Sequence, residues 1–225
     1  MKKIGMLVAV EIDAVLKRYG TLLEEEKVDG FAVRVLKNGE RELYIVQSGA
    51  GEIAAAAAAQ FLISKYGVEL LLNFGVVGGL TPEMALAKTC IVEKVVHYDF
   101  DTSEIDGWAP GQYAGYDSPL MDCPRELVRL AREAHPELKP VVCASADKFV
   151  GDPAKKAALH ERWGADICEM EAAAILLTCN RCGIPCLMIK TVSDSISGGA
   201  GEFAREVSRS ADICLQIAEK VMERL

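Results

Sequence analysis

Short apolar runs alternate with segments of helical periodicity along this chain. The runs over 4–9 and 70–74 are continuous, as expected for strands that are covered on both faces. Two more runs, over 31–36 and 43–46, flank Asn38-Gly39, a dipeptide typical of a tight hairpin turn. Further strands are predicted over 90–96, 140–144, 165–168 and 185–192.

Amphipathic or alanine-rich segments fill the intervals between these strands. Their patterns predict helices over 12–18, 52–65, 124–135, 170–182 and 202–224. Another helix is predicted to begin at Asp152-Pro153, which combines an N-cap residue with proline at the first helical position. The alternation predicts an α/β protein with a largely parallel sheet and a hairpin near its start. No repeat, low-complexity tract or linker interrupts it, so residues 1–225 are expected to form a single domain.

Charge and hydrophobicity narrow the classes of partner. The formal net charge is -8 and the pI is about 5.1, which disfavours a nucleic-acid partner because phosphate binding requires clustered Lys and Arg. No segment approaches the roughly 20 apolar residues of a membrane span. Glu11 and Asp13 cut short the first apolar run, and no small-residue cleavage pattern follows. We therefore expect a cytoplasmic protein with a small-molecule partner and no nucleic-acid or membrane partner.

The eight cysteines lie mostly within apolar runs, where a thiol behaves as a small hydrophobic group. Cys179-x-x-Cys182-x-x-x-Cys186 has a spacing that metal or redox motifs also show. A metal site would need a fourth ligand, however, and the three histidines are remote in sequence. The carboxylates that follow His97 supply no closed ligand set either. We expect neither a metal nor a cofactor.

A long polar stretch over 99–123 contains Gly, Pro and aromatic residues and is predicted to be a loop. A loop of this length in a compact domain is usually functional. Its first part, 101–108, is unusually acidic and ends at Trp108.

Polar residues follow several of the predicted strands directly. Glu11 and Asp13 follow the first strand, a glycine loop over 75–79 follows the strand at 70–74, and acids follow the strands that end at 168 and 192. In α/β sheets ligands bind beyond the carboxyl ends of the strands, so these groups are expected to line one cleft. Taken singly, each acid also fits the role of a helix cap or a solvated first-turn charge.

The segment over 167–174 carries the sharpest signal, because Glu169 and Glu171 flank Met170 between a buried strand and an apolar helix. On the two-residue period of a strand the two glutamates point to the same side. Carboxylates held together in a partly dry cleft suit sugar hydroxyls, or positive charge that develops on a sugar ring.

A glycine motif over 48–54 matches the pattern G-x-G-x-x-A of dinucleotide-binding turns. That fingerprint also requires an acid at the end of the next strand, where this chain has Asn73-Phe74-Gly75. A nicotinamide site is therefore disfavoured, and a tight turn with close helix packing is the simpler interpretation.

Five motifs in a fixed order carry a resemblance that runs nearly from end to end. They are Ser48-Gly-x-Gly51, Asn73-x-Gly-x-x-Gly-Gly79, Ser145-x-Asp-x-Phe149-Val150, Glu169-Met-Glu-Ala172 and Thr191-Val-Ser-Asp194. The chain resembles the nucleoside phosphorylase/nucleosidase superfamily, and within it the methylthioadenosine/S-adenosylhomocysteine nucleosidase branch. The resemblance implies a three-layer α/β/α fold with a central mixed, largely parallel sheet. It also implies a dimer or larger homo-oligomer, in which a loop of one subunit completes the neighbour's pocket; we expect 99–123 to be that loop.

The resemblance further implies roles for individual residues. Asp194 would protonate or hydrogen-bond purine N7, Glu171 would bind the ribose hydroxyls and stabilise an oxocarbenium-like transition state, and Asp13 would activate the attacking water. The implied substrate-binding residues are Phe149, Val150, Glu169, Met170, Ser193, Gly78 and Trp108. A general acid at the leaving group and a base on the opposite face also agree with the expected cleft.

Hydrolysis and phosphorolysis place different demands on such a site. Phosphorolysis needs a cationic, hydroxyl-bearing cradle for a dianion. This chain has Glu11 and Asp13 in the first loop, and Asn73 and Val76 at the glycine-loop positions where phosphorylases of the superfamily place arginine and serine. The missing positive charge predicts a hydrolase. The resemblance to the nucleosidase branch implies that it acts on 5′-modified adenosines, in methionine salvage or a related pathway.

Departures from the nucleosidase pattern keep two alternatives open. The position of the water-activating glutamate holds Asp13, which is one methylene shorter, so that the backbone must come closer or Glu11 must take the role. Val76 stands where the branch usually has serine. The first alternative is a phosphate-dependent purine nucleoside phosphorylase, and the second is a non-catalytic nucleoside-binding relative.

Overall fold

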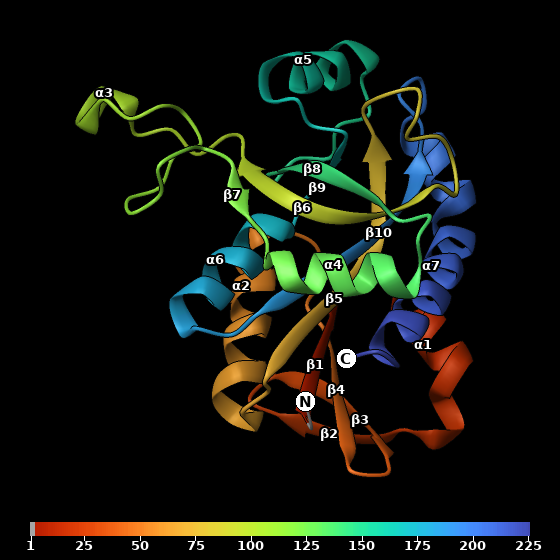
Figure 1. The fold of residues 1–225 in the computed structure, drawn as a ribbon. Coiled ribbons are helices and arrows are strands. Elements are labelled where there is room, and N and C mark those ends of the chain that lie inside the picture. Colours follow the sequence, from red (N-terminus) through yellow and green to blue (C-terminus); the bar gives the residue numbers. More distant parts are fainter. Residues whose placement is uncertain (1–2) are drawn as a thin grey trace.

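Ten strands form one mixed sheet in the computed structural model, which describes residues 3–225 (Figure 1). The strands are β1 (Lys3–Val8), β2 (Glu24–Val28), β3 (Phe31–Asn38), β4 (Arg41–Gln47), β5 (Leu70–Gly79), β6 (Thr89–His97), β7 (Met121–Asp122), β8 (Lys139–Ser145), β9 (Ile167–Glu169) and β10 (Cys186–Asp194). The helices are α1 (Ile12–Tyr19), α2 (Glu52–Phe61), α3 (Ser103–Asp106), α4 (Arg125–Ala134), α5 (Pro153–Trp163), α6 (Ala172–Cys182) and α7 (Ala200–Met222).

Part of the sheet closes on itself. The order runs β10-β6-β8-β9-β5, and β10 also pairs with β5, so these strands form a ring. From β5 the sheet continues outward through β1, β4, β3 and β2. The closure places the ends of β5, β9 and β10 side by side, because Gly78 pairs with Cys168 on one flank and with Asp194 on the other. Strand closure therefore brings together segments that lie far apart in the sequence.

Helices cover both faces of the central strands. In Figure 1, α2 and α6 lie on one side of β1 and β5, and α7 with α1 lies on the other. Every residue of β5 and β10 except Val76 is buried. The layered arrangement and the mixed sheet confirm the predicted fold class.

The strand predicted over 70–74 continues to Gly79, so the expected glycine loop is the second half of β5. Its glycines allow close packing: a Cβ on Gly79 would lie 2.1 Å from the Met84 carbonyl oxygen. At Gly78 a Cβ would lie 3.1 Å from both Cys168 Sγ and Asp194 Oδ2. The second half of β5 pairs with β10 on one side and with β9 on the other. The sequence prediction missed it because hydrophobic periodicity does not indicate such long-range pairing.

Two other elements differ from the sequence prediction. β2 is a strand although its sequence, Glu-Glu-Glu-Lys-Val, has little apolar character, because it lies at the edge of the sheet with its first four residues exposed. The predicted loop over 99–123 contains α3 and β7. The start of α5 is confirmed, since the Asp152 side chain accepts a hydrogen bond from the Lys155 amide.

Residues 99–120, which we call the arm, extend away from the rest of the molecule (Figure 1). The base of the arm is an aromatic stack in which the ring centroids of Phe100 and Tyr113 lie 3.9 Å apart. The returning segment of the arm is fastened to α6, because Asn180 Nδ2 donates to the hydroxyl of Tyr116 at 2.9 Å.

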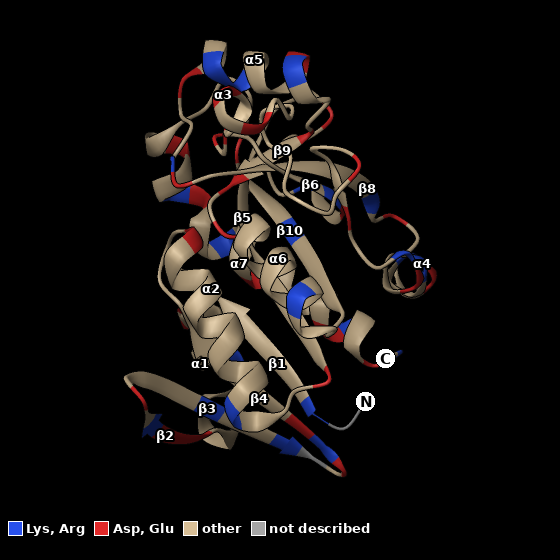
Figure 2. Cartoon of the chain, turned by 90° about the vertical axis from the view of Figure 1, so that its left-hand side faces the viewer, with Lys and Arg blue, Asp and Glu red and all other residues tan. Residues whose placement is uncertain are grey.

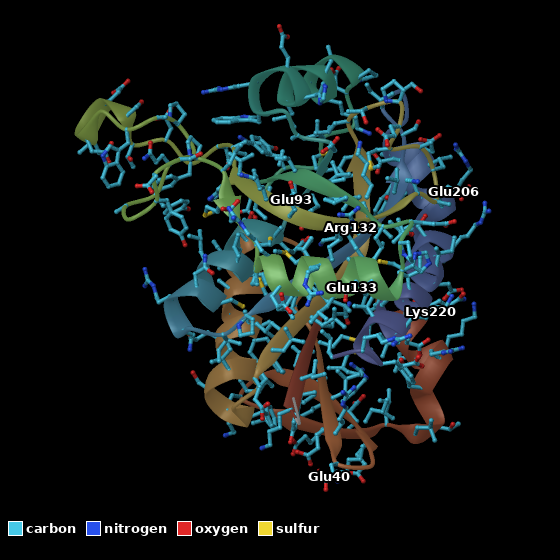
Figure 3. The ribbon with its side chains drawn as sticks, in the orientation of Figure 1. Glu40, Glu93, Arg132, Glu133, Glu206 and Lys220 are labelled. Atoms are coloured by element: carbon cyan, nitrogen blue, oxygen red, sulfur yellow. The ribbon has the colours of Figure 1, made fainter. Side chains whose placement is uncertain are left out.

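Positions of Lys and Arg and positions of Asp and Glu are both spread along the ribbon, and neither sign is confined to one part of it (Figure 2). Side chains fill the space between sheet and helices, while charged groups such as Glu40 and Lys220 lie at the periphery (Figure 3). Within residues 3–225 no helix combines the length and the apolar character that a bilayer crossing requires.

Candidate functional site

A cavity opens at the carboxyl ends of β1, β5, β9 and β10. Its volume is about 110 Å³. The lining residues are Ala9, Val10, Glu11, Ala50, Val76, Val77, Gly78, Lys148, Phe149, Val150, Cys168, Glu169, Met170, Glu171, Ser193, Asp194 and Phe203. Ring closure explains this meeting of distant segments, and it confirms that the polar strand ends share one cleft, with the exception of Asp13.

The Glu11 carboxylate occupies a nest of backbone amides. Its Oε2 accepts hydrogen bonds from the amides of Ala9 at 3.2 Å and Val10 at 2.9 Å. Its Oε1 accepts from the Val76 amide at 2.8 Å. Gly75 leaves the room for it, because a Cβ there would lie 2.8 Å from Oε1. An amide nest at a glycine-rich strand end is a ready site for an anion, and here an internal carboxylate fills it.

Asp13 does not lie with the other acids. It is exposed in the first turn of α1 and does not line the cavity. Glu11 is buried and does line it. Of the two acids that follow β1, only Glu11 therefore belongs to the cavity, and the predicted placement of Asp13 there is wrong.

Glu171 lies between the end of β9 and the start of α6, with its side chain turned to the first turn of α2. Its Oε1 accepts from the Gly51 amide at 2.9 Å. Gly51 has a φ of 104°, a conformation in which glycine carries no steric penalty. Burial, together with the charge of Glu169, raises the pKa of Glu171 to about 7. The glycine motif over 48–51 thus positions a carboxylate.

Glu169 is held differently from Glu171, although both line the cavity. Its Oε2 pairs with the buried ammonium of Lys190 at 3.1 Å, and the same carboxylate accepts from the Ala172 amide. Burial alone would raise the pKa of Glu169, but Lys190, Ser145 and the Ala172 amide outweigh it and lower the pKa. Glu169 is therefore an ionised anchor behind Glu171.

A further carboxylate, Glu52, joins this network from the first turn of α2. Ser145 Oγ lies 2.6 Å from Glu52 Oε1 and 2.6 Å from Glu169 Oε1. Burial, followed by the charge of Glu169, raises the pKa of Glu52 to about 8. One hydroxyl proton cannot be donated to two carboxylates, so a protonated Glu52 that donates to Ser145 completes the chain to Glu169.

Asp194 ends β10 and lines the cavity together with Ser193. Ser193 Oγ donates to Asp194 Oδ1 at 3.2 Å. On its other side, Asp194 Oδ2 lies 2.6 Å from Nζ of Lys156, a fully buried lysine of α5.

Aromatic and apolar groups form the remaining wall. Phe149 is 49% exposed, and its ring meets that of Phe203 edge to face with centroids 5.6 Å apart. Val150 and Met170 also line the cavity. Lys148 Nζ pairs with Asp99 Oδ2 at 2.9 Å, so its charge is compensated at the base of the arm.

Trp108 lies outside the cavity of its own chain. It is 38% exposed on the arm. The other predicted substrate-binding residues, Phe149, Val150, Glu169, Met170, Ser193 and Gly78, all line the cavity.

Sequence reasoning missed three residues that shape the site: Glu52, Lys156 and Phe203. A signal existed for Glu52, which stands at the N-terminus of a helix directly after the glycine turn. No local signal marks Lys156, because it lies beside the exposed Lys155 in a polar helix. Within the described residues, no group of three or more His, Cys, Asp or Glu side chains is arranged to hold a metal ion.

Comparison with known proteins gives consistent matches. The family model described as "Phosphorylase superfamily" matches residues 3–225. An aminodeoxyfutalosine nucleosidase of Campylobacter jejuni is 31% identical over 195 residues, which are 84% of each chain. A methylthioadenosine/S-adenosylhomocysteine nucleosidase structure from the same species has a TM-score of 0.90 at 29% identity, covering 100% of both chains. A futalosine hydrolase mutant of Helicobacter pylori superposes with a TM-score of 0.93 at 25% identity, also over 100% of both chains.

Proposed function

The chain belongs to the phosphorylase superfamily, and on that basis we propose that it hydrolyses the N-glycosidic bond of 5′-modified adenosines. The products would be the free base and the free sugar. The relatives named as nucleosidases support this activity, as does the cluster of carboxylates in the cavity.

The observation that carries hydrolysis over phosphorolysis is the Glu11 carboxylate in the amide nest. A phosphate would need the amides of Ala9, Val10 and Val76, and Glu11 already accepts hydrogen bonds from all three. A phosphate there would also meet the negative charge of Glu11 at close range. Water is uncharged and can accept or donate, so it suits the neighbourhood of Glu11.

Each carboxylate then has a place in the reaction. Glu11 orients a water molecule and takes its proton as the oxygen attacks C1′. Glu171 accepts hydrogen bonds from the ribose hydroxyls and stabilises the positive charge that develops on the sugar ring. Asp194 gives a proton to N7 as the electron pair of the C1′–N9 bond passes to the purine.

Apolar residues hold the two halves of the substrate. Phe149 stacks on the purine, the backbone of Val150 reads its edge, and Met170 packs on the sugar. The cavity within one chain is smaller than the roughly 300 Å³ at which small-molecule sites usually begin, so the 5′ substituent extends beyond it.

The proposed assembly is a homodimer or larger homo-oligomer in which the arm completes a neighbouring cavity. The arm extends away from its own chain and carries Trp108 outside its own cavity (Figure 1). Ile53 and Ile105 are 83% and 89% exposed, which is unusual for isoleucine and favours burial against a second copy.

The test is product analysis by chromatography in phosphate-free buffer. The substrates are methylthioadenosine, S-adenosylhomocysteine, aminodeoxyfutalosine, adenosine and inosine, each with and without added phosphate. Free adenine and free sugar without phosphate are the expected result, and the fastest substrate identifies the 5′ group. A sugar 1-phosphate formed only with phosphate would establish a phosphorylase. Tight binding without turnover would establish a binding protein.

A further inference from the structure

Lys156 is a fully buried lysine that faces away from solvent on α5 and towards the end of β10. Its Nζ lies 2.6 Å from Asp194 Oδ2 and 2.6 Å from the carbonyl oxygen of Ser195. The carbonyl oxygens of Asp194 and Gly198 each lie 3.4 Å away. Lys156 does not line the cavity, so it contacts Asp194 from behind. Burying an ammonium is costly unless it is paired, so this placement is a strong constraint on the surrounding chain.

The same lysine joins the two walls of the proposed base pocket. Phe149 and Val150 lie a few residues before α5, which carries Lys156, whereas Asp194 ends β10 at the turn that leads to α7. These segments already touch, because a Cβ on Gly199 would lie 2.9 Å from the carbonyl oxygen of Gly151. Glu202 fastens the turn from the α7 side, where its Oε2 accepts from the amide and hydroxyl of Ser195.

The geometry points to Lys156 as a positioning residue that fixes the Asp194 carboxyl group for its action on the base. This inference rests on the proposed function. Lys156 does not line the cavity and holds Oδ2, so Oδ2 is the oxygen on the side of Asp194 away from the cavity. The exchange with the purine therefore falls to Oδ1, which lies beside Ser193 Oγ.

The ammonium also acts during the proton transfer. When the O–H bond of Asp194 breaks and the N7–H bond forms, a carboxylate remains on Asp194. A cation 2.6 Å away in a buried site stabilises that carboxylate and needs no reorganisation at the moment of reaction. Lys156 keeps all its own protons in this step.

The experiment compares Lys156→Met with Lys155→Met, a matched control on the neighbouring exposed position. Turnover and KM are measured with the preferred 5′-modified adenosine, and adenine binding is measured by calorimetry. We expect Lys156→Met to lower kcat about a hundredfold and to change KM much less, because a misplaced group costs mainly the chemical step. Adenine binding should weaken about tenfold. Lys155→Met should match the wild type.

A double-mutant cycle separates positioning from a merely structural role. If Lys156 acts through Asp194, kcat of Lys156→Met/Asp194→Asn should equal that of Asp194→Asn within about threefold. A multiplied loss in the double variant would overturn the proposal, and so would wild-type kcat in a folded Lys156→Met. Lys156→Met leaves a buried carboxylate unpaired and can fail to fold, whereas the double variant removes both charges. In that case, kcat of Asp194→Asn is compared with kcat of the double variant, and this comparison alone tests the proposal.

The two proposals fail differently. A wild-type protein that releases no base overturns the proposed hydrolysis, and the adenine-binding series still tests Lys156. Wild-type turnover together with an unaffected Lys156→Met overturns the role of Lys156 alone.

Discussion

Glu11 and Asp13 are two positions apart, yet one is buried in an amide nest and the other is exposed on a helix. We expect Glu11→Gln to lower kcat about a hundredfold or more, because the amide cannot take a proton from water. The side-chain amide of Gln also places an NH2 group, which is a donor, against backbone N–H donors. This repulsion displaces the side chain from the nest. The measurement is initial rates of base release at saturating substrate.

Asp13→Asn is the matched control for that experiment, since it makes the same chemical change two positions further along the chain. Its rate should stay within about threefold of the wild type, as is usual for an exposed substitution away from the chemistry. A large loss in Asp13→Asn with an active Glu11→Gln would reverse the assignment of the two acids.

Glu52 links the site to the pH dependence of stability. Its pKa is raised to about 8 in the folded protein from an ordinary value of 4.5. The native state therefore holds a proton that the unfolded state has lost between these two pH values. The contribution of Glu52 to stability falls as the pH rises through that window.

Glu52→Gln should remove this dependence, because an amide donates to Ser145 and accepts from the Ala174 amide as a protonated carboxyl group would. At pH 9 we expect the variant to be more stable by about 1 kcal/mol or more, which is roughly 2–4 °C in Tm for a chain of this size. The measurement is the melting temperature of the variant and of the wild type at pH 5 and at pH 9. Equal melting temperatures of variant and wild type at pH 9 would mean that ionisation of Glu52 costs no stability, and that its pKa is not raised in the folded protein.

Much of the candidate site follows from local sequence, and the rest depends on contacts that sequence does not show. Strand ends and the segment around Met170 indicated Glu171 and Asp194 because acids followed apolar runs. The choice between Glu11 and Asp13 required the direction in which the chain leaves β1. The partnership of Lys156 with Asp194 joins two elements 38 positions apart, and hydrophobic periodicity carries no signal for such a pair.

Among the elements, β5 has glycines that must satisfy two structural requirements. It pairs with β10 and β9, and it leaves space for Glu11 and Asp194. Gly75→Ala should displace the Glu11 carboxylate from the Val76 amide, because the new Cβ would lie 2.8 Å from Oε1. We expect kcat to fall about tenfold to a hundredfold, since a displacement of about 1 Å is enough for such a loss.

Gly20→Ala is a suitable control for Gly75→Ala. A Cβ on Gly20 would have no atom within 4 Å, and the φ of Gly20 is -46°, which alanine adopts without strain. Its kcat should equal that of the wild type. Full activity in Gly75→Ala would show that Glu11 tolerates displacement, and it would weaken the case for Glu11 as the base.

The elements that sequence predicted well are those with a strong period or a cap. The hairpin around Asn38-Gly39, the N-cap at Asp152 and the apolar runs of β1 and β10 are of this kind. β2 was missed because an edge strand exposes its side chains and needs no apolar face. The second half of β5 was missed because glycine has a low strand propensity and the pairing that fixes it is long-range.

At the scale of the whole molecule, the proposed assembly follows from what one chain leaves exposed. The arm extends outward, and Ile53 stands exposed in the first turn of α2, beside the Gly51 turn that positions Glu171. A second copy that covers Ile53 would therefore lie near the cavity. An arm that reaches into a neighbouring cavity would make substrate binding depend on protein concentration.

The substitution Ile53→Asp tests this dependence. A charge at that position opposes burial in an interface, while aspartate in the first turn of a helix favours the folded chain. Sedimentation should show a dimer or larger oligomer for the wild type and a shift to monomer for Ile53→Asp. KM for the preferred 5′-modified adenosine should rise at least about tenfold in the variant, because the neighbour's arm no longer closes the pocket over the 5′ substituent. Leu22→Asp, at a residue 65% exposed between α1 and β2, should change neither quantity. A monomeric wild type with full activity would show instead that each chain binds the 5′ group alone, and the arm would then need to fold back over its own cavity.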